Sequence, residues 1–199
     1  MTNLWNLIYL GLVFVGTDLQ VFHVIYDTGS GAFLLRTSDC TGCNAGADRF
    51  DIAASSTFNY VVPAQYDRVR YHDGTVLEGR VATDRICPYT TFASCASDSQ
   101  FVAIDYTYGL QDYKDGILGM WSGNVRGYDT TEMFMYSLLD SGVIDLNIFS
   151  FYLTDQDGGS YIDFGEPNTS VMSDPNNILY LPIKANDYWW TSEVTGIRF

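Results

Sequence analysis

The stretch that decides the fold is Val24-Ile25-Tyr26-Asp27-Thr28-Gly29-Ser30, in which an apolar run leads into a short polar turn. The apolar run predicts a β-strand, and because another apolar run follows, Asp27 would stand at the tip of a turn between two strands. Gly29 would let the backbone approach the carboxyl group, and Thr28 and Ser30 would supply hydroxyls that fix it. A general base needs such a fixed position. An ordinary β-turn uses the same residue types, so the tetrapeptide alone leaves both interpretations open.

Apolar runs separated by turn residues continue along the chain and predict three hairpins. The expected pairs are 7–15 with 20–26, 68–71 with 76–86, and 149–153 with 160–164. Further strands are expected at 99–106, 178–183 and 189–199. Aromatic residues make up 16% of the chain and favour β structure, because half-buried strand faces accept large rings. The sequence therefore predicts an all-β fold.

One segment, 130–141, has the pattern of a helix. Its start is marked by two cap candidates and an acidic residue, Thr130, Thr131 and Glu132. Near its end, Asp140-Ser141-Gly142 has the same Asp-x-Gly spacing as Asp27-Thr28-Gly29. Because glycine commonly follows the last turn of a helix, we interpret Gly142 as a C-terminal cap and not as part of a catalytic tripeptide.

Length and charge restrict the possible partners. The chain has 199 residues, 47% of them hydrophobic, which suffices for one domain or slightly more with a sizeable core. Its formal charge is −14, from 24 acidic and 10 basic residues. Phosphates would be repelled, which argues against nucleic acid and against an anionic membrane surface. The charge fits simple solubility, and it also fits a protein adapted to acid; charge alone does not choose between them.

Four cysteines stand in two close pairs, Cys40 with Cys43 and Cys87 with Cys95. Such pairs suit two local disulfides in an oxidising compartment, although four cysteines allow three connectivities. A zinc site of four thiolates is the alternative. The spacing of the second pair is too long for a zinc knuckle, so the sequence favours disulfides and no metal.

The apolar segment at residues 4–15 resembles the core of a signal peptide. However, no Lys or Arg precedes Arg36, so the basic leading region is missing. The segment is also shorter than the ~20 apolar residues that span a bilayer. We therefore expect the first strand of a hairpin here and neither a targeting segment nor a membrane partner.

Short motifs follow one another along the chain in a fixed order. The first are Tyr9-x-Gly11, Gly16-Thr17-x-x-Gln20 and Phe22-x-Val24-Ile25-x-Asp27-Thr28-Gly29-Ser30. Later ones are Ser55-Ser56-Thr57-Phe58 after Phe50, Tyr71-x-Asp73-Gly74-Thr75, Asp115-Gly116-Ile117-Leu118-Gly119, Phe149-Ser150-Phe151-Tyr152-Leu153, Gly159-Ser160 before Phe164-Gly165, and Pro182-Ile183 before Tyr188-Trp189. In this order, from about residue 7 onwards, the chain resembles the pepsin-like aspartic proteases.

The resemblance assigns roles to particular residues. It makes Asp27 the catalytic aspartate of the N-terminal lobe of an acid-protease barrel. The residues that would support its loop are Thr28, Gly29 and Ser30. Tyr71 is similar to the flap tyrosine that closes over substrate, and Gly74 is similar to the glycine at the flap tip. No cofactor or metal is implied.

Two positions depart from the family pattern, and one feature is missing. Leu34 stands where the family usually has a tryptophan that hydrogen-bonds the flap tyrosine, and Asp18 replaces a proline. The mechanism needs two aspartates that share one proton. The resemblance places the second Asp-Thr/Ser-Gly shortly beyond the strand expected at 189–199, so only Asp27 is expected within these residues.

The implied architecture is two-lobed and truncated. It consists of an N-terminal catalytic lobe at 1–147, an interlobe hairpin at 148–168, and the incomplete start of a C-terminal lobe at 169–199. The implied activity is aspartic endopeptidase hydrolysis of polypeptides in an extracellular or lysosomal/vacuolar setting. That setting also assigns the disulfides as Cys40–Cys43 and Cys87–Cys95. The alternatives are an inactive peptide-binding protein of the same fold and, less favoured, a homodimer that supplies Asp27 twice.

Overall fold

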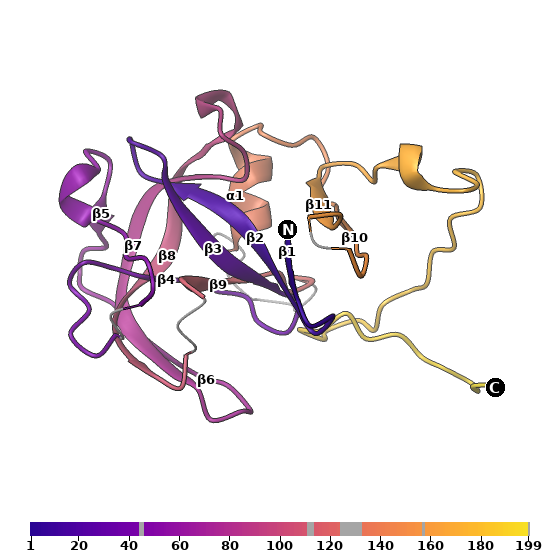
Figure 1. The fold of residues 1–199 in the computed structure, drawn as a ribbon, viewed down its shortest axis with the longest axis horizontal. Coiled ribbons are helices and arrows are strands. Elements are labelled where there is room, and N and C mark those ends of the chain that lie inside the picture. Colours follow the sequence, from indigo (N-terminus) through magenta and orange to yellow (C-terminus); the bar gives the residue numbers. More distant parts are fainter. Residues whose placement is uncertain (44–45, 111–113, 124–132, 157, 199) are drawn as a thin grey trace.

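The computed structural model describes residues 1–43, 46–110, 114–123, 133–156 and 158–198, and it is built mainly of strands around one α-helix (Figure 1). This confirms the expected all-β class. The cap candidates Thr130, Thr131 and Glu132 lie outside the described residues.

The main sheet contains nine strands among the described residues, in the order β1-β2-β3-β9-β4-β8-β7-β5, with β6 paired to β7. Their bounds are β1 Thr2–Leu4, β2 Ile8–Val15, β3 Gln20–Asp27, β4 Phe33–Arg36, β5 Asn59–Tyr60, β6 Tyr66–Arg70, β7 Val76–Cys87, β8 Ala96–Tyr108 and β9 Gly116–Gly119. Two short 3₁₀ turns, η1 (Ile52–Ala54) and η2 (Phe92–Ser94), lie in the connections. A further pairing of β2 with β7 joins strands from opposite parts of the order, so the sheet curls towards a barrel.

The expected hairpins form because their apolar runs alternate with well-placed turns. β2 pairs antiparallel with β3, and β6 pairs antiparallel with β7. What the local pattern did not predict is the central crossing, where β9 lies parallel to β3 and antiparallel to β4. That crossing requires glycine, because a Cβ on Gly119 would lie 2.4 Å from the carbonyl carbon of Gly31.

An aromatic core fills the space inside the curled sheet. Phe22, Phe50 and Phe101 are almost fully buried, and the Phe50 ring meets the other two edge-on at 6.1 Å between ring centroids. Edge-to-face contacts of this kind favour aromatic cores beyond the area that they bury. A second buried cluster, which includes Leu34, Leu77 and Ile117, lies apart from the first.

The helix α1 (Phe134–Asp140) covers β8 and is shorter than the expected 130–141. It buries Phe134, Met135 and Leu138. At its end Gly142 has φ 68°, its N–H donates to Leu139 O at 3.0 Å, and Val143 N–H donates to Leu138 O at 2.9 Å. These two bonds are the pattern of a glycine helix cap, so the interpretation of Gly142 is confirmed.

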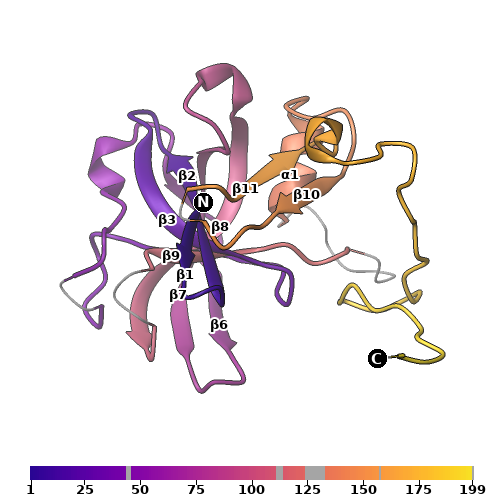
Figure 2. The same cartoon turned by 45° about the vertical axis from the view of Figure 1, so that its right-hand side comes forward.

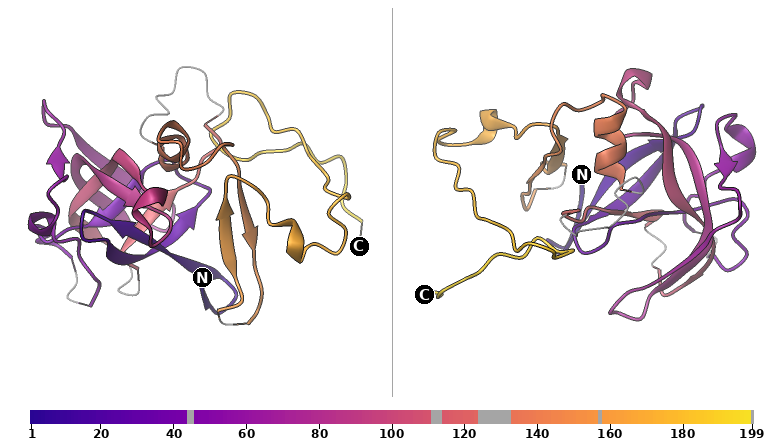
Figure 3. Two further views of the ribbon diagram at one scale, coloured as in Figure 1. Left: turned by 90° about the horizontal axis from the view of Figure 1, so that it is seen from above. Right: turned by 180° about the vertical axis from the view of Figure 1, so that it is seen from behind.

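The hairpin of β10 (Phe149–Tyr152) and β11 (Tyr161–Phe164) forms a separate two-stranded sheet beside the main one (Figure 3). Its Phe164 ring packs on Tyr26 and Phe134, with 5.9 Å between ring centroids in each case. The start of the chain also reaches this hairpin, because Asn3 Nδ2 donates to Thr154 O at 3.0 Å.

The strands expected at 178–183 and 189–199 do not form within the described residues. After the 3₁₀ turn η4 (Thr169–Val171), residues 172–198 run without strand or helix beyond the β10–β11 hairpin (Figure 2). The described backbone bonds within this segment include Asn177 N–H to Asp174 O at 3.1 Å and Lys184 N–H to Thr191 O at 2.8 Å. An apolar run becomes a strand only when another strand satisfies its backbone groups, and the described residues offer this segment no such neighbour. Phe199 lies outside the described residues.

Both disulfides form as assigned, Cys40–Cys43 and Cys87–Cys95. Since all four cysteines are bonded, no thiolate is left for a zinc site of four cysteines. Cys87 ends β7 and Cys95 directly precedes β8, so the second disulfide closes the connection between these two strands.

Candidate active site

Asp27 is the last residue of β3, and its carboxylate is held on both oxygens. Oδ1 accepts the Gly29 N–H at 2.9 Å, and Oδ2 accepts the Ser30 hydroxyl at 2.6 Å. The Asp27 backbone carbonyl accepts Met120 N–H at 2.8 Å. Donors on both oxygens fix the orientation of the carboxylate.

Hydrogen bonds link the turn after Asp27 to β9 and to the residues that follow β9. Gly119 N–H donates to Ala32 O at 3.0 Å, and Trp121 N–H donates to Ser30 O at 3.1 Å. The Trp121 ring lies over Gly31, where a Cβ would come within 2.6 Å of the ring. Sequence reasoning missed the contact between Trp121 and Gly31.

The predicted flap is the turn between β6 and β7. It is closed by two backbone bonds, from Tyr71 N to Thr75 O at 2.9 Å and from Gly74 N to Tyr71 O at 3.0 Å. Gly74 has φ 90°, and a Cβ there would meet no atom within 4 Å. Glycine is therefore required by the backbone conformation and not by crowding.

Tyr71 connects the flap to the Asp27 loop. Its ring packs against the cluster that contains Leu34, and its hydroxyl is buried beside Ser30. Burial raises the pKa of the Tyr71 hydroxyl; the Ser30 hydroxyl lowers it, and the negative charge of Asp27 raises it further. Among the described residues this hydroxyl has no well-formed hydrogen bond. Leu34 offers it none, because its side chain has no donor or acceptor.

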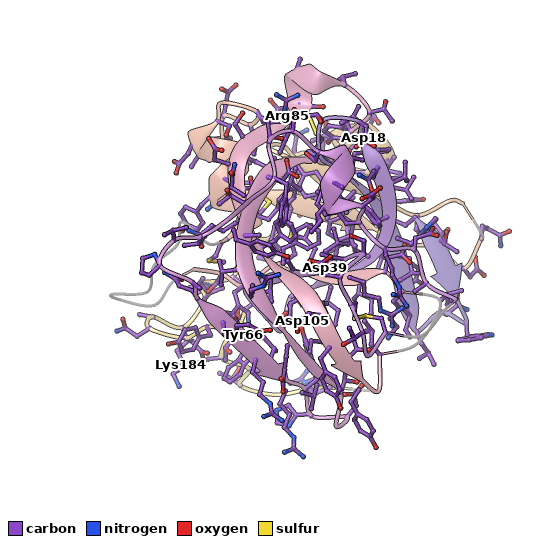
Figure 4. All side chains as sticks on the ribbon, turned by 90° about the vertical axis from the view of Figure 1, so that its left-hand side faces the viewer. Asp18, Asp39, Tyr66, Arg85, Asp105 and Lys184 are labelled. Atoms are coloured by element: carbon purple, nitrogen blue, oxygen red, sulfur yellow. A yellow bond between two sulfur atoms is a disulfide. The ribbon has the colours of Figure 1, made fainter. Side chains whose placement is uncertain are left out.

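The outer surface below the flap is fastened by polar side chains on neighbouring strands. The Tyr66 hydroxyl donates to Asp105, and the Tyr60 hydroxyl donates to Asp39 at 3.2 Å. Figure 4 shows Asp39, Tyr66 and Asp105 on one face of the sheet. Arg80 lies over the Tyr60 ring at 3.6 Å from its centroid. Of these contacts, the one between Tyr66 and Asp105 links β6 to β8.

Other aspartates that could be mistaken for catalytic groups have structural partners. Asp115 is buried and accepts His23 N–H at 2.6 Å and Asp48 N–H at 3.0 Å. Burial raises the pKa of Asp115, and these two hydrogen bonds lower it. Asp84 is buried and accepts the Ser55 hydroxyl at 3.1 Å. Asp140 is exposed at the end of α1. The described hydrogen bonds to the Asp27 carboxylate come from Gly29 and Ser30, so no second acid takes part in them.

Residues near the end of the chain pack on the Asp27 loop. Trp189 Nε1 donates to Gly29 O at 3.3 Å, and Trp190 Nε1 donates to Met120 O at 2.8 Å. The Tyr188 ring lies 4.7 Å from that of Trp121. Sequence reasoning treated this segment as a strand and Tyr188-Trp189 as one of the ordered motifs, and it did not predict these contacts. The run of three aromatic residues was the available signal that this segment packs against another part of the protein.

Thr28 is exposed and borders two cavities beside the Asp27 loop. One, of about 330 Å³, is also lined by Phe149 and Trp190, and the other, of about 380 Å³, by Ile25 and Lys114.

Across the described ranges there is no group of acidic, histidine or cysteine side chains arranged to hold a metal ion. The described helices include none with the length and apolar character needed to cross a membrane.

Comparison with known proteins gives one family match and several relatives of similar sequence. The sequence matches the family model "Eukaryotic aspartyl protease" over residues 8–199. It is 30% identical over 193 residues to vacuolar protease A of Neurospora crassa, 30% over 209 residues to the vacuolar aspartic protease of Candida albicans, and 27% over 197 residues to embryonic pepsinogen of Gallus gallus. These alignments cover 95%, 96% and 96% of this chain but 46%, 46% and 49% of the relatives. The chain therefore spans about half the length of the curated relatives it matches. Because the family model matches nearly every residue, the chain belongs to the eukaryotic aspartyl protease family.

Proposed function

We propose that this chain provides one half of the active site of an aspartic endopeptidase. In this proposal Asp27 is the carboxylate that takes a proton from the attacking water. The observation that carries the proposal is the Asp27 carboxylate, which accepts hydrogen bonds from Gly29 and Ser30. These donors hold the carboxylate in a fixed position, which a general base needs. Tyr71, whose hydroxyl is buried beside Ser30, would close the flap over a bound peptide.

Hydrolysis would use Asp27 together with a second aspartate. Asp27 would take a proton from a water molecule as the water oxygen attacks the peptide carbonyl carbon. The partner, in its protonated form, would donate a hydrogen bond to the carbonyl oxygen. Two adjacent carboxyl groups share one proton because like charges at short distance do not both ionise. The described contacts of Asp27 include no such partner, so we infer that a second lobe supplies it.

The proposed organisation follows from that requirement. Residues 1–147 form the first catalytic lobe, 148–168 an interlobe hairpin, and 169–199 the start of a second lobe. The separate β10–β11 sheet supports the assignment of 148–168 as its own unit. The exposed Leu179 and Tyr180 support the assignment of 169–199 to a second lobe, since such side chains are normally covered in a complete fold. The vacuolar relatives and the two disulfides support a vacuolar or extracellular setting.

A second candidate function is peptide binding without catalysis. The flap and the Asp27 loop could together hold an extended peptide by strand addition, without any reaction. The observation that favours it is the single acid at the site: the hydrogen bonds described at the Asp27 carboxylate have Gly29 and Ser30 as donors.

The first prediction separates these candidates by an assay of hydrolysis at about pH 3 to 4, where such aspartate pairs carry one proton. The full-length protein that contains this chain should cleave a denatured protein substrate. Asp27→Ala should reduce kcat by at least about 10⁴-fold, because the acid pair acts as a unit. Asp140→Ala is the matched control and should leave turnover unchanged, since Asp140 is exposed at a helix end.

The 199-residue chain alone should show no turnover above its Asp27→Ala variant. Turnover that depends on Asp27 in this chain alone would contradict the half-site proposal and would indicate a dimer. A full-length protein that binds extended peptides but does not cleave them would favour the second candidate.

A further inference from the structure

The 380 Å³ cavity beside the Asp27 loop combines an apolar wall with one basic side chain. Its apolar wall is formed by Leu7, Ile8, Ile25, Phe151 and Leu153. Among the described residues that line it, Lys114 carries the one basic side chain. Thr28, which directly follows Asp27, borders the same space. A group bound in this cavity would therefore lie next to the acid proposed to act on the peptide bond.

The residue that follows Lys114 in the sequence is anchored to β3. Asp115 is anchored to β3 by the hydrogen bond from His23 N–H, and its own N–H donates to His23 O at 2.9 Å. Lys114, which lines the cavity, therefore directly precedes an anchored residue. The charges of Lys114 and of Asp73 in the flap turn also influence each other.

The surroundings of Lys114 make its charge accessible to a ligand but poorly hydrated. The side chain is half-buried, and burial lowers the pKa of Lys114, while the negative charge of Asp73 raises it. Asp73 itself is exposed and already accepts Thr75 N–H at 2.9 Å. A carboxylate that enters from the cavity side would add a further, less hydrated partner. Charge-assisted hydrogen bonds are strongest where water is partly excluded.

We propose that this cavity is a specificity pocket for an acidic side chain of a bound peptide, with Lys114 as the residue that determines the preference. The apolar wall suits the methylene groups of glutamate, and the Lys114 ammonium suits its carboxylate. The inference rests on the proposed function, because it requires a peptide that lies along Asp27.

The overall negative charge of the chain bears on which peptides this cavity would bind. A protein with a formal charge of −14 repels acidic peptides in general. A preference for glutamate over the neutral glutamine therefore requires a local positive group that overcomes the general repulsion. Because Lys114 is the basic side chain described in this cavity, its removal should abolish or reverse the preference.

The test measures the affinity of labelled apolar hexapeptides in which a single Glu or Gln is placed at each position in turn. Measurements with the full-length protein at about pH 6.5 keep glutamate ionised. At one position the Glu peptide should bind about tenfold more tightly than its Gln counterpart, as expected for one good charged contact. Lys114→Met should abolish or reverse this ratio, and Lys114→Arg should retain it.

Lys184→Met is the matched control, because Lys184 is the other lysine of the chain and lines a different cavity, with Leu181 and Glu193 (its position is labelled in Figure 4). It makes the same change in net charge and should leave the ratio unchanged. If the wild type binds no peptide at all, the proposed function and this inference both fail. If peptides bind with no Glu preference at any position, or if the preference survives in Lys114→Met, the inference alone is overturned.

Discussion

Asp27, Asp84 and Asp115 all accept amide or hydroxyl hydrogen bonds, but they differ in how deeply each side chain is buried. Asp84 and Asp115 are buried and receive hydrogen bonds from hydroxyl or amide groups, as burial of a charge requires. Asp27 is partly exposed and is held on both oxygens. The sequence distinguishes these roles only through motif context, because an aspartate followed by glycine or threonine fits a turn as well as a catalytic loop. Asp27 was predictable from the motif, whereas its Ser30 and Gly29 bonds needed the fold.

At the residue scale, the flap turn should depend on the ionisation of Asp73. The Thr75 N–H and hydroxyl, followed by the charge of Lys114, lower the pKa of Asp73 below its usual value of 3.8. A carboxylate with a depressed folded pKa stabilises the fold above its unfolded pKa, and this contribution is lost as pH falls through the folded pKa. The Thr75 amide signal in ¹H–¹⁵N spectra should therefore stay constant from pH 6 to about 4 and move only below that. Asp73→Asn should remove the movement. A midpoint at or above pH 4 would contradict this.

At the scale of elements, what could be predicted depended on how local each contact is. The β2–β3 and β6–β7 hairpins were predictable because their turns and apolar alternation lie within a few residues of each other. The parallel pairing of β3 with β9 was not, since it joins Asp27 to Gly119 across most of the lobe. The strands expected at the end of the chain were wrong for a related reason, because strand formation depends on a neighbour that the local sequence does not reveal.

The two disulfides should contribute unequally to stability. Cys87–Cys95 closes a longer loop than Cys40–Cys43, with sequence separations of 8 and 3. By the loop-entropy estimate, Cys87→Ala/Cys95→Ala should lower the free energy of unfolding by about 2.5 kcal/mol or slightly more, because buried Cys87 also packs with Phe14. Cys40→Ala/Cys43→Ala should cost about 2 kcal/mol. Urea unfolding measures both, and a larger loss for the shorter loop would refute the loop-length argument.

At the scale of the whole molecule, a strongly acidic surface coexists with an uncovered apolar segment. Residues 172–198 carry exposed side chains such as Leu179, Tyr180 and Leu181, with 81%, 79% and 63% of their surface accessible. Contiguous exposed apolar surface of this kind promotes association. The charge of −14 opposes association, because like-charged molecules repel one another. The balance between the two therefore depends on pH.

The last prediction is that the 199-residue chain self-associates increasingly as pH falls from 7 towards about 4. The sequence pI is about 4.1, so protonation of carboxylates removes the repulsion while the apolar segment is unchanged. Sedimentation velocity at fixed protein concentration should show monomer at pH 7 in low salt and larger species near pH 4. The triple variant Leu179→Ser/Tyr180→Ser/Leu181→Ser should stay monomeric to lower pH. Val62→Ser, which removes an isolated exposed apolar side chain elsewhere, is the control and should behave as the wild type. Association that persists unchanged in the triple variant would place the contact surface outside residues 179–181, and association that is independent of pH would show that charge does not oppose it.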